Sequence, residues 1–145
     1  MSAEVESGVG YGVKRVQQAL RRRCDAALRP TGLSMSQYAV LRALADHPDA
    51  SGAELARLCF VTRQSLQGVL SDLRAARWVD DSPTQMPGRA RALALTPAGR
   101  RRLGAAHSAV LAVEDEMLAG LTARARIQLA RLLARCADNL EGRCD

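Results

Sequence analysis

The sequence has almost no lysine and few aromatic residues. Of its 21 basic residues all but Lys14 are arginine, and aromatic residues make up 3% of the chain. An apolar content of 48% is ample for a core. With so few large rings available, that core must consist mainly of leucine, valine and alanine. This composition favours packed helices over a β-sandwich.

Long apolar runs and catalytic patterns are also missing. No run approaches the ~20 residues that a membrane span requires, and the first residues, MSAEVESGVGYGV, lack the apolar core of a signal peptide. We therefore expect a cytoplasmic protein with no membrane partner. The four cysteines form no CxxC pair, which argues against a metal site. Without a Ser/His/Asp, Cys/His or phosphate-loop pattern, we expect a binding protein with no cofactor rather than an enzyme.

The N-terminal half begins with two helical patterns. Apolar residues recur at spacings of three and four from about Val9 to Arg29, where Pro30 and Gly32 end the pattern. Ser34 is a cap for a second helix, Met35 to Asp46. We expect residues 1–8 to be disordered and residues 9–145 to form a single domain.

The central stretch predicts two short helices joined by a tight turn. The first covers Gly52 to Cys59 and the second covers Arg63 to Ala76, with FVT between them. Thr62 can cap the second helix, because its hydroxyl can accept a hydrogen bond from a first-turn amide. The second helix buries a face with spacing i, i+3, i+4, i+7, formed by Leu66, Val69, Leu70 and Leu73.

The opposite face of the second helix is polar and suits base edges and phosphates, since Gln can pair with adenine and Arg with guanine. Its candidate DNA-binding residues are Thr62, Arg63, Gln64, Ser65, Gln67 and Ser71. Between Arg57 and Arg102 there are nine arginines and three aspartates, an excess equal to the net charge of +6. A solvated, arginine-rich surface is the alternative explanation of this charge.

Two short strands and two long helices complete the chain. Val79–Ser82 and Arg91–Leu95 are expected to form a hairpin around an irregular loop that carries Arg89. Thr96 and Pro97 then form a strong helix start. One helix extends to about Leu118, and another, capped by Thr122, extends to about Glu141.

The resulting fold is mainly α with a small β-wing. A winged helix-turn-helix, about residues 34–99, is flanked by dimerisation helices at about 9–30 and 97–141. These terminal helices are apolar on more than one face, more than the small winged unit can cover. We therefore expect a two-fold homodimer built from both chain ends.

The order of these parts resembles the MarR family of bacterial regulators. The strings that carry the resemblance are GLSMSQYAVLRAL (32–44), SGAELARLCFVTRQSLQGVLSDLRAARWV (51–79) and GRARALALTPAGRRRL (88–103). The resemblance implies a homodimer that binds double-stranded DNA at a palindromic operator. It also implies a repressor of transcription that is controlled by a small ligand or by oxidation. The recognition helices would enter the major groove and the wings the minor groove.

Two departures from the family pattern stand out. The wing has Pro87-Gly88-Arg89 where the family commonly has Asp-Arg-Arg, so the minor-groove role passes to Arg89, with Arg91 assisting. Arg77 stands after the recognition helix where the family often has glycine. Arg77 must therefore adopt a left-handed conformation at some cost, or the helix must end differently.

Effector and redox sites are the least constrained by the sequence. Tyr11, Arg15, Tyr38 and His107 could line a pocket for an anionic aromatic ligand between the dimerisation helices and the winged unit. The alternative places Tyr38 in the core and Arg15 and His107 on the surface.

Cys24 follows three arginines, which can lower a thiol pKa, so it is the candidate redox residue. It also lies on an apolar stripe, where cysteine acts as a small hydrophobe.

Three interpretations of the function therefore compete. The first is a ligand-released repressor, the second a thiol-based redox-sensing repressor, and the third a winged helix used for protein contacts. The basic excess of the central stretch favours DNA over protein as the partner.

Overall fold

The structure, a computed structural model, describes residues 3–82 and 93–143. The chain divides into two compact units, Met1–Val113 and Glu114–Asp145. The elements of the first unit are α1 (Ala3–Glu6), α2 (Val9–Leu28), the 3-10 helix η1 (Arg29–Thr31), α3 (Met35–Asp46), α4 (Gly52–Leu58), α5 (Arg63–Ala75), β1 (Val79–Asp81), β2 (Leu93–Leu95) and most of α6 (Pro97–Met117). The second unit holds the end of α6 and α7 (Ala123–Glu141).

Side-chain caps set where the helices begin. Ser34 accepts a hydrogen bond from the Gln37 amide at 3.1 Å, and the Gln37 side chain accepts one from the Ser34 amide at 2.9 Å, which completes a capping box. Ser51 caps α4 with a single hydrogen bond, in which its hydroxyl accepts from the Glu54 amide at 3.1 Å. The predicted caps of the later helices are confirmed: Thr62 on α5, Thr96 on α6 and Thr122 on α7.

The N-terminal segment differs from its prediction. Residues 1–8 were expected to be disordered, whereas Ala3–Glu6 forms a short helix, α1. The Gly8 amide donates to the Val5 carbonyl at 3.2 Å and closes the turn that leads into α2. Local backbone hydrogen bonds are sufficient to form one helical turn here, although the sequence offers no hydrophobic periodicity.

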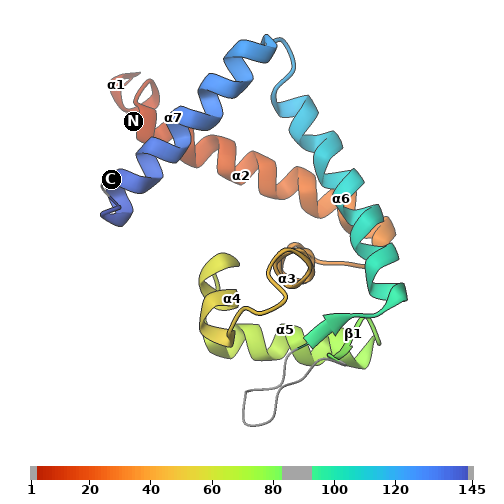
Figure 1. Ribbon diagram of the computed structural model, residues 1–145. Helices are drawn as coiled ribbons and strands as arrows, with labels where there is room; N and C mark the ends of the chain where they lie inside the picture. Colours follow the sequence, from red (N-terminus) through yellow and green to blue (C-terminus); the bar gives the residue numbers. More distant parts are fainter. Residues whose placement is uncertain (1–2, 83–92, 144–145) are drawn as a thin grey trace. The chain divides into compact units, whose positions relative to one another are not determined.

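The core of the first unit is aliphatic, as the composition predicts. α3 lies between α2 and α5 (Figure 1) and contacts both of them, together with α4 and β2. The largest of the described side chains that are almost completely excluded from solvent are Cys24, Leu28, Val40, Leu41, Leu66, Leu73 and Val79. Because Leu66 and Leu73 are 0% exposed, their burial fixes which face of α5 turns toward solvent.

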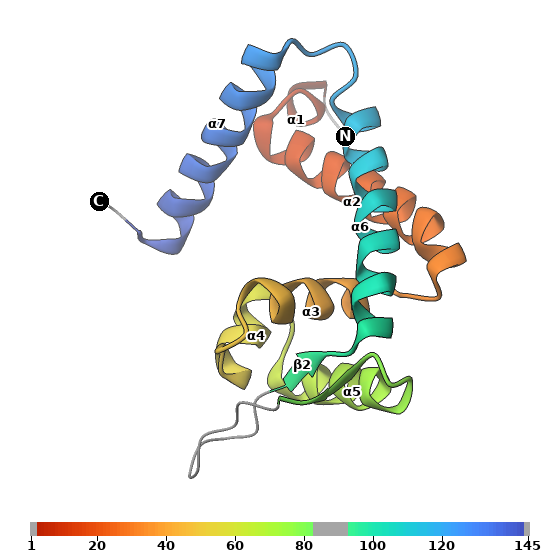
Figure 2. The same ribbon diagram turned by 45° about the vertical axis from the view of Figure 1, so that its right-hand side comes forward.

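The wing contains two short antiparallel strands, β1 and β2. Val79 pairs with Leu95, Asp80 with Ala94 and Asp81 with Leu93. β2 leads directly into α6, beside α5 (Figure 2). β1 ends at Asp81, one residue before the expected end at Ser82. β2 is described from Leu93 to Leu95, and residues 83–92, which include the start of the second expected strand, lie outside the described residues.

Four residues join the end of α5, the sheet and α6. They are Arg77, Trp78, Thr96 and Gly99, and we call them the wing junction. The Thr96 amide donates to the Trp78 carbonyl at 3.0 Å. The Thr96 hydroxyl donates to the Arg77 carbonyl at 2.7 Å and accepts from the Gly99 amide at 3.0 Å. Only glycine fits at residue 99, since a Cβ there would lie 2.0 Å from the Trp78 carbonyl oxygen.

The helices near the chain ends have uncovered apolar faces. α7 has no buried residue among those described. Its large exposed side chains are Ile127, Leu132, Leu133 and Leu140, and Val9, Val13 and Val16 of α2 are also at least half exposed. Within the described part of the chain, no helix is long and apolar enough to cross a membrane. Exposed apolar side chains that line one helix face are typical of surfaces that contact a partner chain.

Gly99 and Gly104 are a matched pair of glycines on α6. A Cβ at residue 104 has nothing within 4 Å. We expect Gly99→Ala to lower the free energy of unfolding by at least about 2 kcal/mol through overpacking. Gly104→Ala should raise it by up to about 1 kcal/mol, because alanine is the better helix former. Urea denaturation measures both, and equal stabilities would contradict the close contact at the wing junction.

Candidate nucleic-acid interface

The turn between α4 and α5 contains a strained residue, Phe60. The Phe60 amide donates to the Arg57 carbonyl at 3.2 Å and the Val61 amide donates to the Ala56 carbonyl at 3.0 Å, the pattern of a Schellman motif. This motif needs a left-handed residue, and here that residue is Phe60, with φ of 55°. Its side chain is 92% exposed, so burial of the ring does not offset the backbone cost.

α5 ends with the same motif. The Arg77 amide donates to the Arg74 carbonyl and the Trp78 amide to the Leu73 carbonyl, both at 3.0 Å. Arg77 occupies the left-handed position, with φ of 60°. The sequence allowed either a left-handed Arg77 or a different end to the helix, and the structure has the left-handed Arg77. The helix that would read DNA is thus bounded on both sides by a non-glycine residue with positive φ.

The residues of α5 and its cap that are predicted to face DNA are all exposed. They are Thr62, Arg63, Gln64, Ser65, Gln67 and Ser71. Thr62 and Ser65 are engaged with each other: the Thr62 hydroxyl donates to Ser65 Oγ at 3.0 Å and accepts from the Ser65 amide at 3.0 Å. Their first role is therefore to begin the helix. Arg63, Gln64, Gln67 and Ser71 are the side chains that remain for contacts with DNA.

A hollow of about 390 Å³ lies beside this face. Arg63, Gln67, Ser71 and Arg74 line one side of it, and Leu93 of β2 is part of the other. Arg63 Nη2 is 3.5 Å from the position that a Cβ on Gly52 would occupy. In this conformation Arg63 therefore lies against the start of α4.

Arg74 joins the recognition helix to the wing. Its Nη1 lies 3.1 Å from Asp81 Oδ1 on β1. Both side chains are about two-fifths exposed, so water screens the pair and its contribution to stability is at most about 1 kcal/mol. Arg89 and Arg91, the predicted wing contacts, lie outside the described residues.

Two of the four predicted effector residues lie together. Tyr38 Oη is 3.0 Å from His107 Nδ1, and the two rings are nearly parallel, with their centroids 6.4 Å apart. Tyr11 is half-buried and Arg15 is exposed on α2. Within residues 3–82 and 93–143, no hydrogen bond or ion pair joins either of them to this pair.

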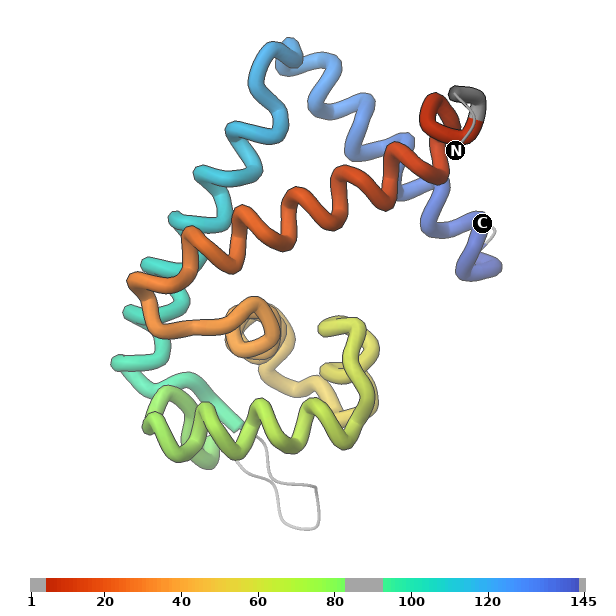
Figure 3. Tube along the Cα trace, turned by 180° about the vertical axis from the view of Figure 1, so that it is seen from behind, coloured from red at the N-terminus to blue at the C-terminus, as the bar shows by residue number. Residues whose placement is uncertain are grey.

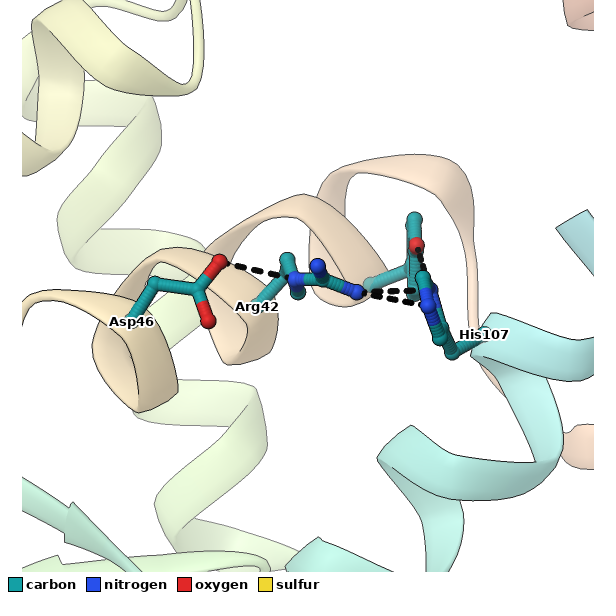
Figure 4. Close-up of polar contacts among 4 residues, drawn as sticks. Arg42, Asp46 and His107 are labelled. Carbon is teal, nitrogen blue, oxygen red and sulfur yellow. Dashed lines mark hydrogen bonds and ion pairs between the residues drawn. The ribbon is translucent and has the colours of Figure 1, made fainter. Parts of the chain in front are cut away.

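Arg42 completes the cluster and was missed by the sequence analysis (Figure 4). Its Nη1 lies 2.6 Å from His107 Nδ1 and 3.0 Å from Nε2, and its Nε lies 2.8 Å from Asp46 Oδ2. A guanidinium only donates, so the imidazole nitrogen that faces Arg42 accepts the hydrogen bond. Burial raises the pKa of Tyr38, and the hydrogen bond to Asp46 raises the pKa of Arg42. The i, i+4 spacing of Tyr38, Arg42 and Asp46 was the available signal.

The candidate redox cysteine, Cys24, is buried. Cys24, the candidate redox residue, is 1% exposed, whereas a sensor thiolate must be accessible. Cys24 lies with Leu28 on the buried side of α2, and this burial weighs against a redox role for it. Burial also raises the pKa of the half-buried Cys59 thiol. In the described ranges no group of three or more His, Cys, Asp or Glu side chains could hold a metal ion.

The fold and the exposed polar helix define a winged helix-turn-helix DNA-binding protein, and comparisons agree. A model of the MarR family matches residues 31–90. The HTH-type transcriptional repressor Rv2887 of Mycobacterium tuberculosis is 35% identical over 134 residues, which are 92% of this chain and 96% of that protein. The chain belongs to the MarR family and is a transcriptional regulator.

Solved structures of Rv2887 are similar to this fold. Its complex with DNA aligns with a TM-score of 0.73 over 90% of this chain and 98% of that one. Its complex with salicylic acid aligns with a TM-score of 0.74 over 90% of this chain and 96% of that one. Both are 35% identical in sequence.

The left-handed residue after α5 leads to a prediction about stability. Arg77→Gly should raise the free energy of unfolding by about 0.5–1 kcal/mol, because relief of the left-handed strain exceeds the entropy that glycine adds to the unfolded chain. Arg77→Ala removes the same charge and retains the strain, so it should bring no gain. Thermal unfolding compares the two variants. An equal gain from alanine would assign the effect to the side chain instead.

Proposed function

We propose that the protein is a homodimeric repressor that binds a palindromic operator through α5 and the wing, and that a small anionic aromatic ligand releases it. The observation that carries the proposal is the exposed face of α5. Arg63, Gln64 and Gln67 lie one turn or less apart on a helix whose other face is held by the buried Leu66 and Leu73. Donors and acceptors on such a rigid helix can read base edges in the major groove.

The dimer follows from the uncovered apolar stripes of α2 and α7. A two-fold axis pairs identical surfaces, and two recognition helices then face two half-sites of a palindrome. In this proposal Arg89 and Arg91 reach the minor groove from each wing. A regulator of this kind acts where the chromosome is, in the bacterial cytoplasm, and carries no catalytic role.

The effector proposal rests on the cluster of Tyr38, Arg42 and His107. A carboxylate that bound Arg42 would compete with Asp46 and His107 for the same donors, and so would change how α3 meets α6. α3 contacts α5 directly, which links the cluster to the DNA-binding face. Rv2887 has been crystallised with salicylic acid, a ligand of the proposed chemistry, and also with DNA.

The burial of Cys24 makes the redox alternative the weaker one. A role in protein contacts would not explain the exposed arginines of α4, of α5 and of the turn after α5, among them Arg57, Arg63 and Arg77. We therefore rank DNA as the partner.

The first test is Arg63→Ala. Affinity for DNA from the region upstream of the gene should fall by about 1–3 kcal/mol, the value of a lost base contact. Arg124→Ala, at an exposed position of α7, removes the same charge far along the chain and should leave the affinity unchanged. Fluorescence anisotropy with labelled DNA measures both. Equal losses in the two variants would show that overall charge, not a contact of α5, governs binding.

The second test locates the effector, with salicylate as the probe. Salicylate should weaken operator binding by the wild-type protein, and Arg42→Met should abolish that response. Arg21→Met is the control, because Arg21 lines a separate hollow of about 410 Å³ with Met35 and Phe60.

If Arg21→Met removes the response and Arg42→Met retains it, the ligand occupies that hollow and not the cluster. If neither variant changes the response, both locations are wrong.

A further inference from the structure

Arg102, on the second turn of α6, contacts two segments that are far apart in the sequence. Its Nη1 donates to the Thr31 carbonyl at 2.7 Å. Its Cζ lies 5.3 Å from the centroid of the Trp78 ring, in cation–π range. Thr31 ends the corner that follows α2, and Trp78 lies between α5 and β1. One exposed guanidinium thus joins the end of the first long helix to the base of the wing.

Both contacted segments are held firmly. Thr31 is 8% exposed, and its hydroxyl donates to the Leu28 carbonyl at 2.6 Å and accepts from the Leu33 amide at 3.2 Å. The corner then turns at Gly32, with φ of 75°.

Trp78 is fixed through its backbone. Its amide donates to the last turn of α5, and its carbonyl accepts from Thr96. Because neither end can yield locally, a displacement of one end must either move the other end or break the contact with Arg102.

We propose that Arg102 is a positioning residue for DNA binding, which couples the corner after α2 to the wing junction. The proposal rests on the proposed DNA-binding function. Arg102 itself need not touch DNA: it sets the orientation of α5 and the wing relative to the helix that leads into the dimer. The neighbouring Arg101 is also exposed on α6, and it makes no such bridge to any residue that the structure describes.

The chain contains a single tryptophan, and it is the residue under Arg102. Its fluorescence therefore reports directly on this contact. Loss of the guanidinium should change the emission of the free protein, and the shift on addition of operator should shrink. A role of Arg102 in overall stability alone would not reduce the operator-dependent shift.

The experiment compares Arg102→Met, which retains a long apolar stem, with Arg101→Met, which removes the same charge. Operator affinity is measured across a range of salt concentrations, together with the emission of Trp78. We expect Arg102→Met to weaken binding by about 2- to 30-fold, the range for residues that couple sites without touching ligand. The slope of log affinity against log salt should not change. Arg101→Met should resemble the wild type in emission and affinity.

Two results would overturn the proposal. A salt slope that falls by about 0.9 would show that Arg102 contacts a phosphate itself. Unchanged affinity with altered emission would show that the contact with Trp78 has no influence on DNA binding.

If Arg102→Met folds poorly, Arg102→Lys retains the charge over the ring and a donor for Thr31, and it should restore most of the affinity. Failure of the wild-type protein to bind its upstream DNA would count against the proposed function, whereas the emission of the free protein would still test the bridge.

Discussion

The close approach of α6 to the Trp78 carbonyl is the contact on which the DNA-binding unit depends. At this contact α5 has just ended and β1 is about to begin, while β2 has just ended and α6 starts. Thr96 bonds to both Arg77 and Trp78, and the missing side chain of Gly99 lets the backbones meet. Because these elements share one set of hydrogen bonds, a shift of α6 cannot leave the wing or the end of α5 unchanged.

The recognition helix is held in place at a cost in backbone strain. Phe60 before it and Arg77 after it both have positive φ, where an L-residue is disfavoured by about 1–2 kcal/mol. Figure 3 shows α5 as the light-green helix that follows α4. Backbone strain persists where the surrounding structure determines the conformation, and it is often found at functional sites. The strained residues lie beside the exposed polar face rather than in the core.

The polar contacts away from α5 connect it to the rest of the first unit. Arg42 joins α3 to His107 on α6, and Arg102 joins α6 to both the corner after α2 and the wing junction. These are contacts between charged or polar groups at partly exposed sites, where binding of a ligand or of DNA can compete with them at modest cost. Among the described residues, Thr31 is the polar side chain that is buried with the apolar core, so a ligand or DNA can compete more easily for the contacts of Arg42 and Arg102 than for contacts in the core.

Local chemistry in the sequence determined the order and the ends of the elements. Capping hydroxyls bond within three residues of themselves, so the predicted caps are confirmed. The leucine spacing of α5 needs only helical geometry, and the side of α5 that is predicted to face DNA is exposed. The bridges could not be predicted, since Arg42 and His107 are 65 residues apart and meet only when α3 packs near α6. The burial of Cys24 likewise depends on how α2 lies on its neighbours. Periodicity shows that a helix has an apolar stripe, but only tertiary packing decides which part of that stripe is covered.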